Sequence, residues 1–386
     1  MFLLACGIYV YFAAIPQKVV APARDTPAPA KPAEPVSLSS RALFMGDIYW
    51  GRYINDWSMA SPLKTAYPFS RLNEFQRDTY DAWVANLECP TVADFKQTSA
   101  QEDATLSFNC SPDYLAEAAK WFSIVSLANN HTDNRGAAGF AETKAHLTEH
   151  GIQYFGHYDP AVLDDVCEVV AFPVTVSYDV GEAQQQSLPV ALCGFHGVFK
   201  IPPAGAIAQI HQYAELMPVI AMPHMGAEYQ TAPDTLRRSL YHAMIDAGAD
   251  MVLANHPHWV QSTEAYQGKL IVYSMGNFIF DQQANQEVTR SAAIEVVMNT
   301  TNTSPVLLAQ WLALGKTCQT FKDHCLAEAQ AQGLQRLPFE FAYGVVGSSS
   351  AQKITKPATE AEQARIVERL MWSHTMNQLR PPQSSL

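Results

Sequence analysis

Residues 217–258 have the sequence MPVIAMPHMGAEYQTAPDTLRRSLYHAMIDAGADMVLANHPH. The segment predicts three successive elements: a buried strand at 217–223, a helix at 232–247 and a second buried strand at 250–254. Gly248 follows the predicted helix, a common position for glycine at a helix end. A strand, a helix and a strand in this order are typical of parallel pairing in an α/β sheet.

The same alternation continues on both sides of this segment. Further strands are expected at 41–47, 82–88, 122–128, 152–156, 167–176, 188–194 and 269–275, and further helices at 111–121 and 137–150. Segments 290–298 and 305–311 are expected to be β, with no helix between them. We therefore predict an α/β domain over residues 41–315. Residues 316–386 are expected to form a C-terminal extension with a helix at about 359–377, opened by a capping box.

The composition is apolar and acidic. The 386 residues include 25 Lys and Arg against 37 Asp and Glu, which gives a formal net charge of −12. Hydrophobic residues make up 48% of the chain and charged residues 16%. This combination excludes a mainly disordered chain, which needs low hydrophobicity and high charge. The acidic balance argues against nucleic acid as a partner, because backbone phosphates require a basic surface.

The first residues are uncharged and apolar, with FLLACGIYVYFAAI at 2–15. This run is shorter than the roughly 20 residues of a membrane span, so we favour a membrane anchor or truncated signal segment over 1–16. Two alternatives stay open: a lipoprotein signal at Cys6 and an ordinary buried strand or helix. Residues 17–40 are rich in Pro and Ala over 21–38, and they are expected to form a linker to a globular body.

Six of the seven cysteines follow this linker. Six cysteines allow 15 disulfide connectivities, so the sequence cannot assign them. Nearness along the chain suggests the pairs Cys318–Cys325, Cys89–Cys110 and Cys167–Cys193. Free buried thiols are an equally good alternative at this stage.

Residues of types that commonly bind metals follow several predicted strands, at the carboxyl end of each strand. They are Asp47, Glu88, Asn130, His131, His224, His256 and His258. Because the carboxyl ends of parallel strands meet at one edge, five strands bring these side chains to one rim. Carboxylate, amide and imidazole groups suit Zn, Mn or Fe, and this many groups predict two metal ions bridged by a carboxylate. Singly, each residue is more often a turn, a cap or a core histidine, and only their joint placement favours a metal site.

Five longer segments surround these residues: FMGDIYWGR (44–52), ANLECPTV (85–92), SLANNHTDNRGAAGFAETKAHLTEHGI (126–152), PHMGAEYQTAP (223–233) and IDAGADMVLANHPHWVQSTEAYQGKLIVYSMGNFIFDQ (245–282). In this order they resemble the CapA family of bacterial poly-γ-glutamate capsule biosynthesis. The resemblance implies a calcineurin-like metallophosphoesterase fold, a four-layer α/β/β/α sandwich with two packed β-sheets. It also implies a protein of the cell envelope, tethered to the membrane with its domain in the periplasm or at the cell surface.

The resemblance to metallophosphoesterases implies a role for each ligand. Asp47 and His258 would bind the first of two divalent metal ions, Asn130, His224 and His256 the second, and Glu88 would bridge both. His131 would act as a general acid or orient the substrate. The superfamily's usual Asp-x-His element is Asp47-Ile48-Tyr49 here, so that one ligand of the first ion is absent.

Three further residues lie close to these motifs. Arg52 is a candidate for contact with an anionic substrate, with a structural ion pair as the alternative. Glu228 is a candidate for orienting an imidazole, with a solvent-exposed acid as the alternative. Asn277 follows Gly276 at a strand end, where it either binds substrate or turns the chain.

Two functions are compatible with these residues and motifs. The first is a metal-dependent hydrolase or transferase acting on an anionic envelope polymer or on a phosphoester precursor of one. The second is a non-catalytic, metal-stabilised subunit that works with capsule synthesis and export proteins. The net charge of −12 is unfavourable for binding poly-γ-glutamate, because it repels the polymer until local positive charge compensates at short range.

Overall fold

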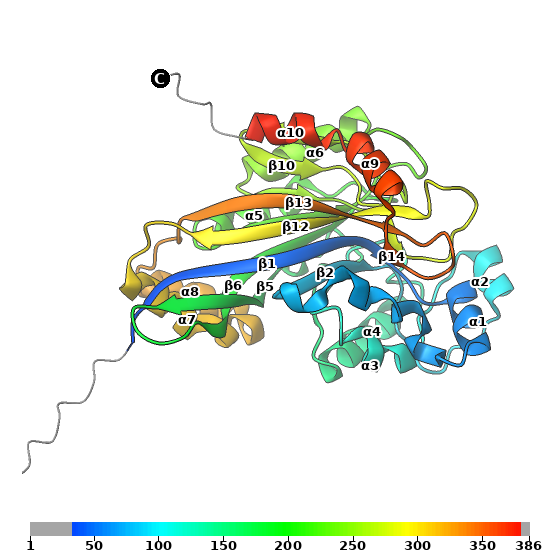
Figure 1. The fold of residues 1–386 in the computed structure, drawn as a ribbon. Coiled ribbons are helices and arrows are strands. Elements are labelled where there is room, and N and C mark those ends of the chain that lie inside the picture. The colour runs from blue at the N-terminus through cyan, green and yellow to red at the C-terminus, as the bar shows by residue number, and fades with distance from the viewer. Residues whose placement is uncertain (1–32, 380–386) are drawn as a thin grey trace, which may run out of the picture. The chain divides into compact units, whose positions relative to one another are not determined.

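Strand β1 (Pro35–Ile48) is the strand from which the sheet extends in two directions (Figure 1). One of its edges pairs antiparallel with β12 (Arg290–Thr300). The other edge pairs antiparallel with β5 (Cys167–Tyr178) at first, and parallel with β2 (Ala82–Leu87) from Ala42 onward. Because β5 and β2 follow one another along the same edge, the sheet divides into two arms at β1.

The computed structural model describes residues 33–379, and the anchor expected at 1–16 lies outside this range. Among the helices of the described range, none combines the length and the apolar character that crossing a bilayer requires. The linker was expected to extend to residue 40, whereas β1 begins at Pro35. Leu38 and Ser40 are buried, so the last residues assigned to the linker belong to the folded body.

The remaining strands extend the two arms and the opposite edge of β1. The first arm continues from β2 through β3 (Ile124–Ser126) and β4 (Gln153–Phe155), all parallel. The second arm continues from β5 through β6 (Gln184–His196), β7 (Val219–His224), β8 (Met251–Leu253), β10 (Lys269–Val272) and β9 (Thr263–Tyr266). Beyond β12 lie β13 (Phe339–Ser349) and β14 (Lys356–Pro357), and β11 (Asn277–Ile279) pairs parallel with the end of β1. The strands β6, β7, β8 and β10 are mutually parallel, as the alternation of strands and helices predicts.

Alternating side chains of β1 and β2 enter two different cores. Phe44 and Val84 pack with the apolar side chains of the second arm, in the larger core. Leu43 and Trp83 point to the opposite face and pack with helices, in a smaller aromatic core. The predicted fold class, a mixed α/β sandwich with two packed sheet layers and helices outside, is therefore confirmed.

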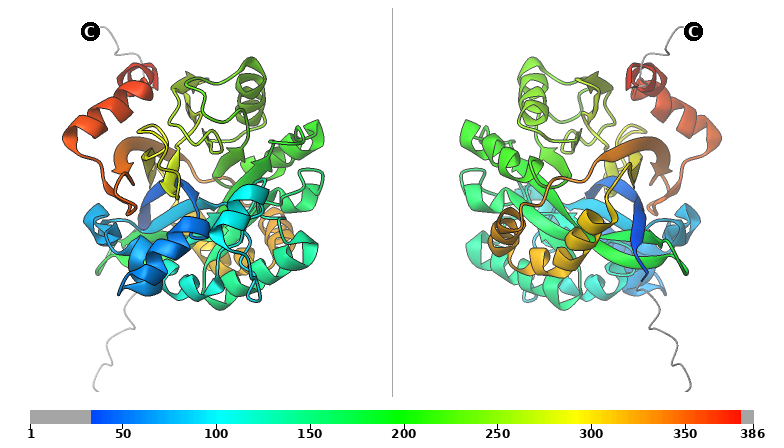
Figure 2. Two further views of the ribbon diagram at one scale, coloured as in Figure 1. Left: turned by 90° about the vertical axis from the view of Figure 1, so that its right-hand side faces the viewer. Right: turned by 90° about the vertical axis from the view of Figure 1, so that its left-hand side faces the viewer.

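Helices flank the strands on both sides (Figure 2). The first arm is accompanied by α1 (Arg52–Ala60), α2 (Ser99–Thr105), α3 (Leu115–Ala118) and α4 (Gly136–Glu149). Later in the chain come α5 (Ala204–Ala214), α6 (Thr235–Asp246), α7 (Pro305–Thr320), α8 (Lys322–Ala331), α9 (Glu360–Arg369) and α10 (Trp372–Leu379). Short 3₁₀ turns lie at Lys64–Phe69, Leu72–Phe75, Arg77–Thr79, Pro112–Tyr114 and Leu163–Asp165.

The β prediction for 305–311 is wrong, because these residues open helix α7. Ser304 stands at the N-cap and Pro305 in the first turn, which is a regular helix start. Leu308 and Trp311, three positions apart, are both buried against the larger core. The buried residues of this run therefore have helical spacing, and Ala309 between them is exposed.

Two predicted helices differ in length from the structure. The helix expected at 111–121 is a 3₁₀ turn followed by the single turn α3. The helix expected at about 359–377 begins with the predicted capping box of Thr359 and Glu362, but it breaks into α9 and α10. Met371 lies between them with a φ of 53°, a left-handed conformation that interrupts the helix.

All three disulfide pairs suggested by nearness are present: Cys89–Cys110, Cys167–Cys193 and Cys318–Cys325. Cys167 and Cys193 lie opposite one another in the antiparallel pair of β5 and β6. The alternative of free buried thiols is therefore excluded for these six cysteines.

Candidate metal centre

The strands of both arms end beside one another and deliver their polar residues to one site. Asp47 lies near the end of β1, Glu88 directly follows β2, and His224 ends β7. The loop after β3 supplies Asn130 and His131, and the loop after β8 supplies His256 and His258. All of these side chains except that of His131 are buried, and Asp47 and Glu88 are 0% exposed. The predicted convergence of five strand ends on one rim is therefore observed.

Four of these side chains point their donor atoms at one position. His224 Nε2 lies 2.8 Å from Asn130 Oδ1, 3.2 Å from His256 Nδ1 and 3.5 Å from Glu88 Oε1. Ligand atoms around a tetrahedral ion with bonds of about 2.1 Å lie about 3.4 Å apart. These two nitrogens and two oxygens thus have the spacing and the chemistry of a divalent metal site.

A second group of donors adjoins the first and shares Glu88 with it. Asp47 Oδ2 lies 3.7 Å from His258 Nδ1, and Asp47 Oδ1 lies 3.5 Å from His224 Nδ1. The donor atoms of Asp47, Glu88 and His224 lie within 4.8 Å of one another, as do those of Glu88, His256 and His258. Glu88 belongs to both sets, which is the position that a bridging carboxylate requires.

The carboxylate of Glu88 is unusual in having no hydrogen bond. Both of its oxygens are buried, and neither has a hydrogen-bond partner among residues 33–379. Burial raises the pKa of Glu88, and the neighbouring Asp47 carboxylate raises it further. The charge on His224, whose Nε2 lies 3.5 Å from Glu88 Oε1, offsets part of this burial without making a hydrogen bond. A buried carboxylate without hydrogen bonds remains costly in free energy, because no donor replaces the water it loses. A bound cation would supply the missing partner, so this residue fits a metal site.

The pKa values of two of the imidazoles are shifted in opposite directions. Burial opposes protonation of His224, but Glu88 and Asp47 outweigh burial and raise the pKa of His224 to about 9. Burial lowers the pKa of His256 well below its ordinary value, and the charge on His224 lowers it further. The ring of His256 is therefore neutral, which is the form that binds a metal.

The backbone around Pro257 is held in a strained conformation. His256 has a φ of 95° and His258 a φ of 58°, both in the region that favours glycine. The carbonyl of Pro257 accepts a hydrogen bond of 2.9 Å from Tyr229 N–H, and His256 N–H donates to Asp47 Oδ2 at 3.4 Å. Strain of this kind persists only where surrounding contacts impose it, and it is frequent at functional sites. Here it presents two imidazoles from three consecutive residues to one centre.

His131 is held in one tautomer beside this centre. Asn134 Oδ1 accepts a hydrogen bond of 2.7 Å from Phe108 N–H and lies 3.0 Å from His131 Nδ1. Nδ1 therefore carries the proton of the neutral ring, and the bare Nε2 lies 3.9 Å from Glu88 Oε1. Burial lowers the pKa of His131 to about 3, and its ring stacks on Phe108 at 3.9 Å. At neutral pH the residue thus presents a hydrogen-bond acceptor to the centre.

Tyr49 stands two residues after Asp47, where the resemblance to metallophosphoesterases implies a histidine. Its ring is buried between Phe108 and Phe280, at centroid distances of 5.0 and 5.2 Å. Its hydroxyl donates a hydrogen bond of 3.3 Å to Glu102 Oε2, in the smaller core. The ligand lost from the sequence motif is therefore not replaced by the tyrosine.

Comparison with protein families places this site within a known group. A family described as bacterial capsule synthesis protein PGA_cap matches residues 41–282, which is more than half of the chain. The chain belongs to the PGA_cap family. The segments that resembled the CapA family all lie within the matched residues, so that resemblance is confirmed.

Named relatives agree with this assignment. The capsule biosynthesis protein CapA of Bacillus anthracis is 28% identical over 261 residues, which cover 62% of this chain and 59% of that protein. The PGA biosynthesis protein CapA of Bacillus subtilis is 28% identical over 253 residues, covering 62% and 63%. A probable polyglutamine synthesis accessory protein of Mycobacterium tuberculosis is 28% identical over 245 residues, covering 58% and 62%. The aligned part thus spans about three fifths of the length of each relative.

The region that matches the PGA_cap family contains every candidate ligand. The three further residues named from the sequence, Arg52, Glu228 and Asn277, differ from one another in their contacts. Arg52 makes two hydrogen bonds to Asp281, of 2.9 and 2.7 Å, and it also pairs with Asp103 at 3.2 Å. Its side chain is 5% exposed, so the guanidinium is engaged in ion pairs within the protein. Glu228 is exposed. Asn277 Oδ1 lies 2.7 Å from His258 Nδ1, which places this amide against a candidate ligand.

Three polar residues beside the candidate metal centre were not predicted from the sequence. Asn86 Nδ2 donates to Asp47 Oδ1 at 2.8 Å, and Asn129 Nδ2 donates to Asn86 Oδ1 at 3.1 Å. His196 ends β6 beside His224, its partner in the strand register. Asn86 lies two residues before Glu88, and side chains two residues apart in a strand point to the same face. This spacing could have identified Asn86 as a neighbour of the centre.

His196 should make the stability of the protein dependent on pH. Its Nδ1 lies 2.6 Å from Tyr158 O, and burial lowers its pKa to about 4. Between that value and its ordinary pKa near 6.5, the unfolded chain binds a proton that the folded chain does not, so stability falls with acidification. We expect acidification from about pH 7 to pH 5 to lower the free energy of unfolding of the wild type by about 2 kcal/mol more than that of His196→Gln. Urea denaturation in the presence of EDTA measures this difference.

The control for this pH dependence is His211→Gln, because His211 is largely exposed on α5. It is expected to follow the wild-type pH profile. Parallel profiles for the wild type and His196→Gln would contradict the assignment of this pH dependence to His196.

Proposed function

We propose that this PGA_cap protein binds two divalent metal ions, Mn, Fe or Zn, and uses them to hydrolyse or transfer a phosphoester during the synthesis of an anionic envelope polymer. The proposal rests on one observation above all. Glu88 is a fully buried carboxylate without hydrogen-bond partners in the described structure, set between Asp47 and three histidines. Divalent cations held by these residues would compensate the charge of Glu88 and would be bound by the surrounding nitrogens.

The chain's own residues would bind and orient the reactants. Asp47 and His258 would hold the first ion, Asn130, His224 and His256 the second, and Glu88 both. Bound ions supply a water whose pKa is lowered toward about 7 and neutralise the charge of a phosphoryl group. Nε2 of His131 would accept a hydrogen bond from a reacting water or a substrate hydroxyl, and Asn134 keeps the ring in the tautomer that this requires.

A cell-envelope location outside the cytoplasm belongs to the same proposal. Three disulfides support it, because disulfides persist in oxidising compartments and are rare in the cytoplasm. The capsule-related names of the relatives also agree with an envelope location. We further propose that the N-terminal segment tethers the domain to a membrane, where capsule synthesis and export proteins would be its partners.

A second candidate function is a metal-stabilised subunit without catalytic activity. The position of Tyr49 favours it, because a first-ion ligand common in phosphoesterases is replaced by a ring that points into the aromatic core. The two candidates agree on metal binding and differ on turnover. One experiment therefore tests both.

The test joins metal content to activity in the full chain. Protein purified without chelator is analysed for Mn, Fe and Zn, and then assayed with a generic phosphomonoester and phosphodiester after addition of each metal. His256→Ala is expected to lose metal and turnover together. His131→Ala is expected to keep its metal and to lose turnover by about 10²-fold or more, the usual contribution of a proton-transfer group.

His211→Ala provides the matched control, because this histidine is exposed and remote from the centre in sequence and in contacts. It is expected to match the wild type in metal content and turnover. Metal bound to the wild type without turnover of either phosphoester would favour the non-catalytic subunit. Absence of bound metal in a folded wild type, before and after metal addition, would refute both candidates.

A further inference from the structure

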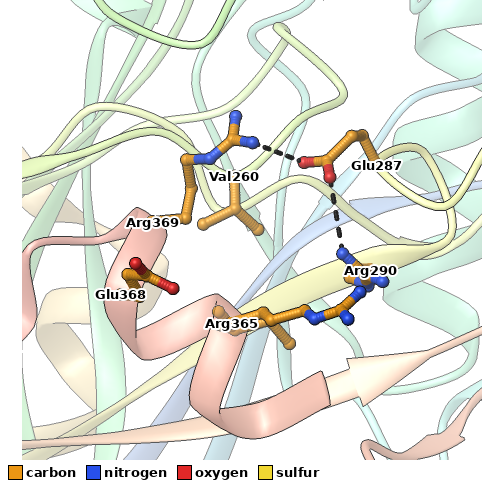
Figure 3. Close-up of a pocket in the computed structure, with 7 residues that line it drawn as sticks. Val260, Glu287, Arg290, Arg365, Glu368 and Arg369 are labelled. Carbon is orange, nitrogen blue, oxygen red and sulfur yellow. Dashed lines mark hydrogen bonds and ion pairs between the residues drawn. The ribbon is translucent and has the colours of Figure 1, made fainter. Parts of the chain in front are cut away.

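A pocket of about 550 Å³ lies between α9 and the start of β12, outside the metal centre (Figure 3). Its lining residues are Val260, Glu287, Arg290, Arg365, Ile366, Glu368 and Arg369. Three of these seven residues are arginines, in a chain whose net charge is −12. A pocket of this size is within the range that holds small molecules or parts of larger ones.

The positive charges of this arginine pocket are only partly neutralised. Glu287 is shared between two arginines: its Oε1 lies 3.4 Å from Arg290 Nη1, and its Oε2 lies 3.0 Å from Arg369 Nη2. Glu368 is the other acid among the lining residues. The lining thus holds three arginines and two acids, and Glu362 of α9 also interacts electrostatically with Arg290.

Two of the guanidinium groups have unused donors. Nη1 of Arg369 is buried and has no hydrogen-bond partner within the described part of the chain. The exposed Arg365 makes no ion pair with any residue that the structure describes, and its side chain points toward Arg290 (Figure 3). Buried donors without acceptors and converging like charges are both unfavourable until an anion joins them.

The arginine pocket is connected to the metal centre through a short loop. Asn277 Oδ1 lies 2.7 Å from His258 Nδ1, and Asn277 Nδ2 donates a hydrogen bond of 3.2 Å to Val288 O. Val288 directly follows the pocket residue Glu287, and Val260 lies two residues after His258. The same loop therefore supports a candidate metal ligand on one side and the pocket arginines on the other.

We propose that the arginine pocket binds an oxyanion, a carboxylate or a phosphate, carried by the substrate of the metal centre; the link to that substrate rests on the proposed function. Guanidinium groups match both kinds of oxyanion, because each offers paired donors to two oxygens. The protein as a whole is acidic, and the pocket gives it a local attraction for an anionic polymer. This attraction acts within a Debye length, which is roughly 10 Å at 0.1 M salt. The binding of the anion itself requires neither metal nor turnover.

The test measures anion binding by the full chain in EDTA, so that the metal centre cannot contribute. The probes are a fluorescein-labelled γ-linked glutamate oligomer and inorganic tripolyphosphate, each titrated in low-salt buffer. Arg365→Gln is expected to raise the dissociation constant about fivefold, and Arg365→Glu by more than about tenfold. Arg369→Gln is expected to weaken binding as well, with its melting temperature recorded because it also loses the pair with Glu287.

Arg71→Gln is the matched control, since Arg71 is an exposed arginine outside the pocket that pairs with Glu74. It is expected to bind both probes as the wild type does. Tight binding of the glutamate oligomer would identify carboxylate as the ligand, and tight binding of tripolyphosphate alone would identify phosphate. Wild-type protein that binds neither probe, or Arg365 variants that bind like the wild type, would overturn the proposal. Because turnover is not measured, a lack of catalysis at the metal centre leaves this result unaffected.

Discussion

Replacing Glu88 by Gln is expected to have opposite effects on stability without and with metal. In EDTA, the substitution removes a buried negative charge that has no donor within the described structure, while keeping the shape of the side chain. Below about pH 9 this charge also stabilises protonated His224, whose Nε2 lies 3.5 Å from Glu88 Oε1 and whose pKa is raised to about 9. The comparison is therefore made above that pH, where His224 is neutral and the free energy of unfolding should stay equal or rise by about 1–3 kcal/mol. Most substitutions of a fully buried polar residue destabilise, so this sign is specific to a carboxylate that lacks its cation.

With metal, Glu88→Gln should lack most of the stabilisation that metal binding gives the wild type. An ion at 100 times its dissociation constant stabilises the folded state by about 2.7 kcal/mol. Glu88→Gln is expected to show less than about half of this gain, and its metal-dependent turnover should fall by about 10²-fold or more. Thermal and urea denaturation with EDTA and with added Mn²⁺ or Zn²⁺ measure stability, while elemental analysis and the phosphoester assay measure metal content and turnover.

Glu74→Gln serves as the control for Glu88→Gln, because Glu74 is an exposed acid in a 3₁₀ turn. It should change neither the metal response nor the turnover. A Glu88→Gln protein that is strongly destabilised in EDTA, or that retains two ions and full activity, would contradict the bridging role of Glu88.

The strand ends could be predicted from the sequence because their signal is local. A buried strand is a short apolar run, and a polar residue directly after it is conspicuous, as at His224 and His256. Parallel pairing then brings such residues together without further information. The six candidate ligands share this pattern, and the structure places all six in contact or close to it.

Residues inside an apolar run were missed for the same physical reason. Asn86 is a polar residue within a buried strand, and its amide is satisfied by Asp47 and Asn129, which lie on other segments of the chain. Helix α7 was mistaken for β because Leu308 and Trp311 are buried on one face, while its short apolar run fits either element. Only tertiary contacts decide such cases.

The arginine pocket could not be predicted from spacing. Arg290 begins β12 and Arg365 lies in α9, and these elements meet only because β12, β13 and α9 pack on one another. No motif joins residues so far apart in the chain. Arg52 shows the converse, because its sequence position left a substrate contact and a structural ion pair open, and the structure pairs it with Asp281.

Gly46→Ala is expected to be the most disruptive small substitution near the centre. A Cβ at position 46 would lie 1.7 Å from the backbone oxygen of Gly276 and 2.8 Å from its carbonyl carbon. That same oxygen accepts the hydrogen bond of 3.1 Å from Asp47 N–H, which joins β1 to the segment before β11. No side chain can move to relieve the contact, so the two backbones must separate.

Separation of these backbones acts on stability and on metal binding together. Asp47 pairs in register with Asn277, so both would shift relative to His258 and Glu88. We expect a loss of more than about 3 kcal/mol in the free energy of unfolding in EDTA. Metal affinity should fall by at least about tenfold in the folded fraction, because ligand positions tolerate only small errors. Urea denaturation and metal titration measure the two effects separately.

Gly205→Ala is the matched control for Gly46→Ala, since both replace a glycine that has no left-handed backbone. A Cβ at position 205 would meet only Leu163 Cδ1, at an ordinary distance of 3.5 Å, in the first turn of α5. This variant should be as stable as the wild type, or more stable by about 0.5–1 kcal/mol, because alanine favours the helix. If Gly46→Ala also kept wild-type stability and metal affinity, β1 and β11 could not be as close as the proposed centre requires, and the placement of Asp47 beside Glu88 would have to be abandoned.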